Sequence, residues 1–183
     1  MAHALIVGDR GVGKSTLLRR VLLELGQPVF GFETKKEPVP GADGSDAQIF
    51  LYLTGEPRQQ TRDNRVGYCR GGRVTAVPGA FDRFAPALLR PVPEGAVIRF
   101  DELGFLESGE TGFCGAVLAR LEGGVPVMAA VKERDTPFLQ AVRGHPQCRS
   151  FLITRENRER LFGEVLDFMR EQLQKAERRS GDG

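Results

Sequence analysis

Residues 8–15 read Gly-Asp-Arg-Gly-Val-Gly-Lys-Ser, a full match to the pattern G-x-x-x-x-G-K-[ST]. The short apolar run at residues 4–7 precedes this stretch and suits a strand buried on both faces. From about residue 13 to residue 25, apolar side chains recur at helical spacing, and Gly26 and Pro28 then end the helix. A strand, a glycine-rich turn and a helix in this order predict a loop that binds phosphate groups.

Each residue type in this phosphate loop (residues 8–15) suits a polyphosphate ligand. Glycines let successive backbone N–H groups point inward, and the helix that follows presents its positive end to the same anion. Lys14 adds a charge near the terminal phosphates, so we expect it to be catalytic, and Ser15 offers a hydroxyl ligand to Mg²⁺. Arg10 either reaches the terminal phosphate or faces solvent. The predicted phosphate-binding residues are Gly8, Asp9, Arg10, Gly11, Val12, Gly13, Lys14, Ser15 and Thr16.

Two carboxylates follow the apolar run at residues 97–100. Ligands bind at the carboxyl ends of strands in parallel sheets, so Asp101 is expected to hold Mg²⁺ indirectly, through water, from a strand that neighbours the first one. Glu102 comes next and is expected to orient and deprotonate an attacking water, which favours hydrolysis over transfer to an organic acceptor. The alternative is that both acids only begin a solvated loop. Arg99 is unusual within such a strand, and it lies either near a sheet edge or beside a carboxylate.

Strands alternate with helices along most of the chain. Further strands are predicted at 29–32, 97–100, 126–131 and 151–153, and further helices at 81–89, 113–121, 136–142 and 155–175. This alternation predicts an α/β fold with a mostly parallel central sheet covered on both faces. A turn-rich stretch at 38–46 leads into short strands at 48–54, 65–70 and 73–77, which predict an antiparallel hairpin extension. We predict one domain over residues 1–175 and a frayed tail over 176–183.

Composition excludes several classes of protein. The 183 residues carry 26 Lys and Arg against 24 Asp and Glu, so no strong charge argues for a nucleic acid partner. No apolar run approaches the ~18–20 residues that span a bilayer, and no signal peptide is seen, so a cytoplasmic protein without membrane contact is expected. Cys69, Cys114 and Cys148 lie far apart, which predicts free thiols and no zinc site.

Four segments resemble the cancer-related, or thermophile, nucleoside-triphosphatase family. They are the phosphate loop, Gly-Phe-Glu-Thr at 31–34, Asp-Glu-Leu-Gly-Phe-Leu-Glu at 101–107 and Thr-Arg-Glu-Asn-Arg at 154–158. The segments stand in the family's order and at compatible spacing across nearly the whole chain. The resemblance implies a RecA-like P-loop NTPase fold, a three-layer sandwich, and slow Mg²⁺-dependent hydrolysis of ATP, GTP and related nucleotides.

The same resemblance implies roles for residues outside the phosphate loop. It places Thr154, Asn157 and Arg158 in the base or ribose pocket, although Thr154 also suits a helix N-cap. It makes Glu107 a support of the active site, whereas the residue alone reads equally well as a solvated acid. The family has acidic residues after Gly-Phe-x-Thr where this chain has Lys35 and Lys36, a departure that bears on the substrate range.

Three other functions remain open at this point. A nucleotide or small-molecule kinase uses the same loop, and the arginine-rich segment 56–73 then grips an acceptor phosphate. Whatever the reaction, that segment either contacts phosphate or a protein partner, or it is only a solvated surface. A nucleotide-binding accessory protein is the second alternative. A regulatory GTPase is disfavoured because no N-K-x-D motif exists. Without an assigned arginine finger we expect a turnover of ~10⁻⁴ to 10⁻² s⁻¹; the candidates for that role are Arg134, Arg143 and Arg158.

Overall fold

The computed structural model describes residues 2–39 and 46–181, and within these ranges eight strands form one sheet. The strands are β1 (His3–Gly8), β2 (Val29–Pro38), β3 (Ala47–Leu53), β4 (Arg65–Arg70), β5 (Arg73–Ala76), β6 (Val97–Leu103), β7 (Val127–Lys132) and β8 (Cys148–Leu152). The helices are α1 (Lys14–Leu25), the 3-10 turn η1 (Asp82–Phe84), α2 (Ala85–Leu88), α3 (Thr111–Glu122), α4 (Pro137–Arg143) and α5 (Arg158–Gly181). The turn-rich stretch predicted at 38–46 falls largely on residues 40–45, outside the described residues.

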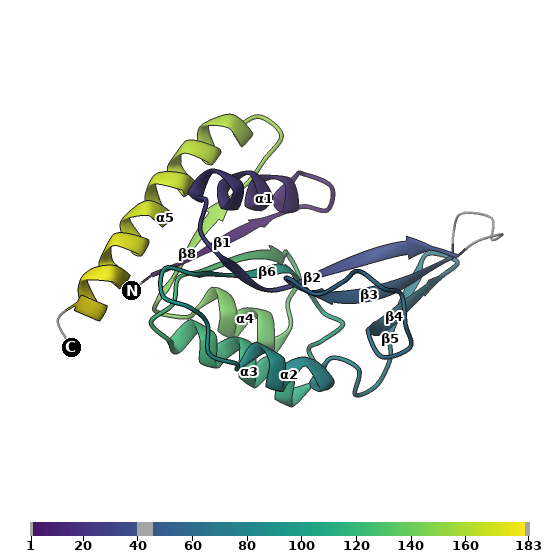
Figure 1. Cartoon of the computed structure of the whole chain (residues 1–183). Helices are drawn as coiled ribbons and strands as arrows, with labels where there is room; N and C mark the ends of the chain where they lie inside the picture. The colour runs from purple at the N-terminus through teal and green to yellow at the C-terminus, as the bar shows by residue number, and fades with distance from the viewer. Residues whose placement is uncertain (1, 40–45, 182–183) are drawn as a thin grey trace.

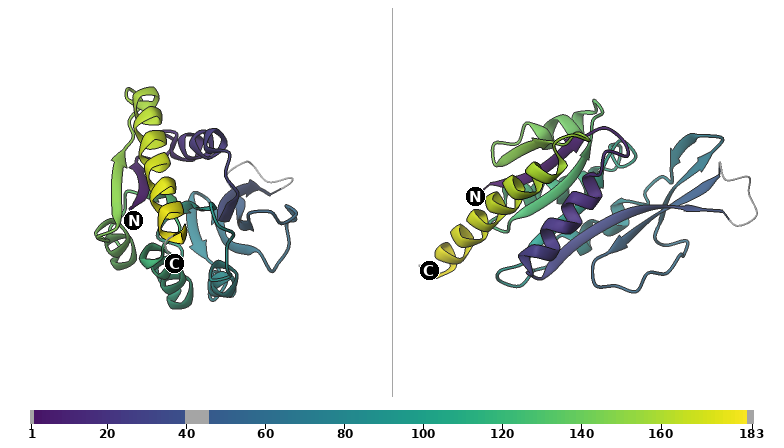
Figure 2. Two further views of the ribbon diagram at one scale, coloured as in Figure 1. Left: turned by 60° about the vertical axis from the view of Figure 1, so that its left-hand side comes forward. Right: turned by 90° about the horizontal axis from the view of Figure 1, so that it is seen from above.

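The strand order is β5-β4-β3-β2-β6-β7-β1-β8. The five strands from β2 to β8 in this order run parallel, and β3, β4 and β5 add to β2 in antiparallel fashion (Figure 1). The predicted mostly parallel α/β sheet with an antiparallel extension is therefore confirmed. Seen from above, the extension (the arm, β3–β5) projects away from the helices, and both termini lie at the opposite end (Figure 2).

Helices cover both faces of the parallel part, so the molecule has three layers (Figure 1). One apolar cluster joins α1 and α5 to the sheet, with Leu18, Val21 and Met169 among its buried residues. The other cluster joins α2, α3 and α4 to the opposite face and contains three closely packed rings: Phe32, Phe100 and Phe113. Strand β1 lies between these clusters and is buried along its whole length, as its continuous apolar run predicts.

Strand β7 lies between β1 and β6 and pairs with both in parallel. The expectation that Asp101 stands on a strand next to the phosphate-loop strand is therefore wrong. Single-sequence patterns do not reveal strand order, because every buried parallel strand reads as a similar apolar run. Because β7 lies between them, β1 and β6 are two inter-strand spacings apart, about 9.6 Å.

Several element boundaries differ from the predicted ones. Strand β2 continues six residues past Phe32 because it pairs with β3 from Phe32 to Pro38. Helix α5 begins at Arg158 rather than at residue 155, and it extends to Gly181, through most of the predicted frayed tail. Residues 182–183 of that tail lie outside the described part of the chain. The predicted helix at 81–89 divides into η1 and α2.

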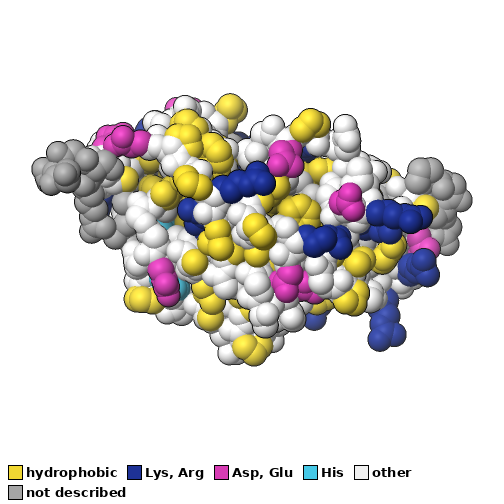
Figure 3. Space-filling view, turned by 60° about the horizontal axis from the view of Figure 1, so that its bottom comes forward, with side chains coloured by type: hydrophobic (Ala, Val, Ile, Leu, Met, Phe, Trp, Pro, Cys, Tyr) yellow, Lys and Arg dark blue, Asp and Glu magenta, His cyan; other side chains and the backbone are white. Residues whose placement is uncertain are grey.

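The surface on the side of α2, α3 and α4 shows apolar side chains dispersed among polar atoms, with Lys and Arg side chains gathered toward the arm (Figure 3). The large apolar side chains that are exposed, Leu23, Leu89 and Leu152, stand on three different segments of the chain. Within residues 2–39 and 46–181, no helix is long and apolar enough to cross a membrane.

Candidate active site

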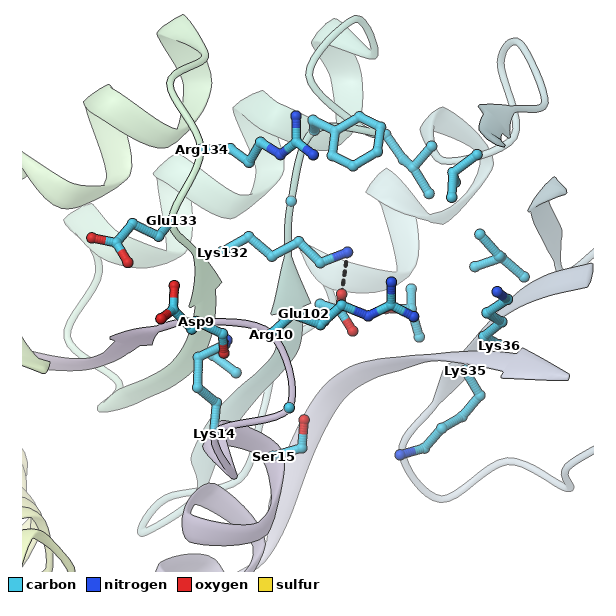
Figure 4. A pocket seen from close by; sticks show the side chains of 18 of the residues that line it. Asp9, Arg10, Lys14, Ser15, Lys35, Lys36, Glu102, Lys132, Glu133 and Arg134 are labelled. Atoms are coloured by element: carbon cyan, nitrogen blue, oxygen red, sulfur yellow. Dashed lines mark hydrogen bonds and ion pairs between the residues drawn. The ribbon is translucent and has the colours of Figure 1, made fainter. Parts of the chain in front are cut away.

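A cavity of about 670 Å³ opens at the carboxyl ends of the parallel strands and continues toward the arm (Figure 4). The phosphate loop forms one wall, and the ends of β6 and β7 with the segments that follow them form another. The arm closes the far end. The polar and charged side chains that line the cavity include Lys14, Ser15, Lys36, Glu102, Glu107 and Lys132. All the predicted phosphate-binding residues line it except Val12, whose side chain is buried in the apolar cluster beneath α1.

The phosphate loop has a backbone that only glycine adopts easily. Gly13, which precedes α1, has φ 106° and so lets the helix begin directly behind the loop. The Lys14 ammonium donates hydrogen bonds to the carbonyl oxygens of Gly8 at 2.5 Å and Asp9 at 2.7 Å, which folds its side chain over the loop. Burial is the main cause that lowers the pKa of Lys14. A desolvated ammonium at a helix N-terminus is a strong anion-binding group.

Asp101 and Ser15 come together although 86 residues separate them in the chain. The Ser15 hydroxyl donates to Asp101 Oδ1 at 2.6 Å, and Asp101 is only 2% exposed. A hydroxyl and a carboxylate are hard oxygen donors, the type that Mg²⁺ prefers when it also keeps waters and binds substrate phosphates. No group of three or more His, Cys, Asp or Glu suited to a metal occurs in the described ranges.

Glu102 lies inside β6, not after it as predicted, and has an unusual backbone. The register between β6 and β7 shifts between Asp101 and Leu103, so Glu102 is the extra residue of a β-bulge. Its φ of 92° makes it the sole non-glycine residue with positive φ within residues 2–39 and 46–181. The bulge turns its carboxylate into the cavity, where it forms an ion pair with Lys132 (Figure 4). Strain of this kind persists at functional sites.

Glu107 is buried beside the same cavity rather than solvated. Its carboxylate accepts a hydrogen bond from the backbone N–H of Gly104, and its carbonyl oxygen accepts one from the Cys114 thiol at 3.2 Å. Burial raises the pKa of Glu107 to about 7. These contacts shape the segment that follows β6, so Glu107 supports the wall of the cavity, in keeping with the role that the resemblance implies.

Arg99 lies in a central strand and points at a carboxylate. Its guanidinium is 3.7 Å from Glu33, a residue of β2 that is 3% exposed. Lys35 approaches the same carboxylate at 3.3 Å, and Arg58 of the arginine-rich segment also pairs with it. Of the two explanations left open for Arg99, pairing with a carboxylate is confirmed and an edge position is wrong. The cluster fastens the segment after β3 to the sheet, next to the strand that carries Asp101.

The turn at 154–158 lies beside the phosphate loop but outside the cavity. Asn157 closes the turn, since its side chain accepts from the Thr154 N–H at 2.8 Å and donates to the Leu152 carbonyl at 2.9 Å. Arg158 approaches the loop, because a Cβ added to Gly13 would lie 3.7 Å from its Nε. Thr154 and Asn157 are thus held by hydrogen bonds within the turn, and Arg158 lies against the loop.

The other two arginine candidates differ in their surroundings. Arg143 donates to the carbonyl oxygens of Lys132 and Arg134 and pairs with Asp135 at 2.9 Å, so it braces the turn after β7. Arg134 lines the cavity, with its guanidinium 5.2 Å from the centre of the Phe105 ring. Geometry therefore favours Arg134 over Arg143 as a cation that could approach a bound phosphate.

Sequence reasoning passed over two charged residues of this region. Lys132 ends β7, and a lysine directly after a buried apolar strand is a signal of the same kind as Asp101 after β6. Glu33 was part of a quoted segment without a role of its own. The clue to Glu33 in the sequence was Arg99, because a charge within a buried strand requires a partner of opposite charge, here on a neighbouring strand.

Comparisons with known proteins agree with this geometry. The model of a family described as NTPase matches residues 3–166. The chain is 31% identical over 172 residues to nucleoside-triphosphatase THEP1 of Pyrococcus abyssi, covering 92% of each chain. It is 27% identical over 187 residues to the cancer-related nucleoside-triphosphatase homolog of Bos taurus, covering 91% of this chain and 96% of that one.

Two solved structures share the fold. The crystal structure of THEP1 from Aquifex aeolicus has a TM-score of 0.66 at 23% identity, covering 92% of this chain and 98% of that one. The solution structure of a human cancer-related nucleoside triphosphatase also has a TM-score of 0.66, at 22% identity, covering 93% and 98%. The family model and the Pyrococcus abyssi relative confirm the resemblance read from the four segments: the chain belongs to the NTPase family.

Proposed function

We propose that this protein is a Mg²⁺-dependent nucleoside triphosphatase that releases the terminal phosphate of ATP, GTP and related nucleotides. The observation that carries the proposal is the meeting of three groups at one cavity. The phosphate loop holds Lys14, the Ser15 hydroxyl binds Asp101 at 2.6 Å, and the Glu102 carboxylate enters the same space from the bulge. The relatives named above carry the name nucleoside-triphosphatase, and this supports hydrolysis over the kinase alternative.

The proposed roles follow from the position of each group. The N–H groups of the phosphate loop and the N-terminus of α1 cradle the phosphates, and Lys14 turns from its own loop carbonyls to the β- and γ-phosphates. Ser15 and Asp101 would hold Mg²⁺, which supplies positive charge to the phosphate oxygens when it is bound. Glu102 orients a water toward the γ-phosphate and accepts its proton, so the products are a nucleoside diphosphate and inorganic phosphate.

The proposal also covers the nucleoside site, the location of the protein and a partner. Arg158 beside Gly13 favours a base or ribose site at the 154–158 turn. The described cysteines are free thiols, which is typical of the cytoplasm, the location we propose. A protein partner at the arginine-rich segment 56–73 is proposed from its charge; Arg58 already pairs with Glu33.

The test is phosphate release from a panel of nucleoside triphosphates in Mg²⁺ or EDTA, with the nucleotide product identified by chromatography. Wild type should release phosphate only with Mg²⁺, and Glu102→Gln should lose most of that activity. Glu171→Gln is the matched control, because Glu171 is an exposed glutamate of α5 and undergoes the same chemical change. Release that persists in EDTA, or that Glu102→Gln leaves intact, would contradict the proposed function.

A further inference from the structure

Lys132 is the residue in direct ionic contact with Glu102, and it reaches that position from a different strand. It ends β7, the strand inserted between the phosphate-loop strand and the strand of Asp101. In the parallel register its Cα partner is Gly8, the first residue of the phosphate loop. Lys132 is therefore attached through backbone pairing to the loop and through its side chain to the proposed base.

The Lys132 side chain is itself held on several sides. Its ammonium lies 5.6 Å from the centre of the Phe105 ring, within the range of a cation–π contact. A Cβ added to Gly104 would lie 3.1 Å from its Cδ, so its stem packs against the backbone of that residue. Gly104 and Phe105 belong to the segment that the buried Glu107 shapes. A lysine restrained in this way can fix another side chain, whereas a freely rotating surface lysine cannot.

Glu102 needs such a restraint because of where the bulge leaves it. Its side chain is 36% exposed, and Lys132 is the partner with which it forms an ion pair in the described part of the chain. The backbone bulge determines the direction in which the carboxylate leaves the strand, but not the rotation about its side-chain bonds. A general base must stay within hydrogen-bond reach of the water that it activates.

We propose that Lys132 is a positioning residue for catalysis: it holds the Glu102 carboxylate at the mouth of the cavity in the orientation that serves the attacking water. The inference rests on the proposed function, because it concerns the base of that reaction. It assigns to Lys132 an effect on turnover that passes through Glu102, and not a contact with the nucleotide.

The test combines single and double variants. Lys132→Met retains the stem and removes the charge; it should lower kcat about 10- to 100-fold, the scale on which a misplaced catalytic group reduces rate, and change KM for the nucleotide less than about twofold. Lys132→Arg should restore most of the loss. In a Glu102→Gln background, Lys132→Met should cause no further loss in single-turnover assays with excess enzyme. Lys175→Met, which removes a lysine that pairs with Glu171 on α5, is the matched control.

Three results would overturn the inference. One is a wild-type rate in Lys132→Met. Another is a rise in KM with kcat unchanged, which would place Lys132 on the nucleotide. The third is an equal loss in the wild-type and Glu102→Gln backgrounds, because Lys132 would then act independently of Glu102. Absence of Mg²⁺-dependent release from wild type would instead refute the proposed function, so the two failures are distinguishable. Thermal unfolding of each variant confirms that it is folded.

Discussion

Glycine at position 102 is expected to make the protein more stable than alanine does, the reverse of the usual order in a strand. Both substitutions remove the carboxylate and its ion pair with Lys132, so they differ only in backbone effects. Alanine keeps a Cβ at φ 92°, where a left-handed conformation costs about 1–2 kcal/mol. Glycine avoids this strain but loses about 0.5–1 kcal/mol more through unfolded-state entropy. We therefore expect the free energy of unfolding of Glu102→Gly to be higher than that of Glu102→Ala by about 0.5–1 kcal/mol.

Urea unfolding of the two variants measures this difference directly, and thermal unfolding should show the glycine variant about 1–4 °C higher for a domain of this size. Both variants should lack phosphate release. Thr75, an exposed residue of β5, provides the matched pair: there alanine should be the more stable by about 0.5–1 kcal/mol. An alanine variant at position 102 as stable as the glycine variant would refute the account of Glu102 as a strained bulge residue.

Three further perturbations have expected outcomes. Lys14→Ala should reduce phosphate release about 10²- to 10³-fold, the cost of one lost electrostatic contact to a transition state; a near-normal rate would contradict the assigned site. Glu33→Gln should lower the free energy of unfolding by about 3 kcal/mol, because Arg99 is left without its carboxylate, as urea titration would measure. Burial raises the pKa of Glu107 from 4.5 to about 7, so the folded protein binds the Glu107 proton more tightly than the unfolded chain does. The stabilisation that this provides is complete below pH 4.5 and is lost as the pH rises from about 4.5 through 7. Glu107→Gln should remove that part of the pH dependence; a stability profile parallel to wild type would refute it.

The phosphate loop and its two flanking elements were predictable because their chemistry is local. The run at residues 4–7, the glycines and the helical spacing up to Leu25 all lie within one stretch, and the structure reproduces them as β1 and α1. Asp101 was picked out because a carboxylate after a buried apolar run, in a chain that also carries a phosphate loop, is typical of a site for Mg²⁺. The hydrogen bond between Ser15 and Asp101 agrees with the phosphate-loop motif, which expects both side chains beside one Mg²⁺ ion.

What escaped prediction depends on contacts between distant segments. The place of β7 between β1 and β6 follows from packing of the whole sheet, and the β2 extension exists only because β3 pairs with it. The bulge at Glu102 likewise arises from the register of β6 against β7, which the sequence of β6 alone does not encode. Lys132 was overlooked for the same reason, because its importance appears only once β7 stands beside the base.

Strand β2 joins the parallel part of the sheet to the arm. It pairs with β6 over Val29–Glu33 and with β3 over Phe32–Pro38, so the overlap is only two residues long. Ten residues of strand span about 33 Å, and among them Gly31 has a φ of 112°. Phe32 and Glu33, the two residues of β2 that pair on both sides, therefore connect the arm to the strand that carries Asp101. The arm is thus joined, through β2, to the end of the site where we propose that Mg²⁺ binds.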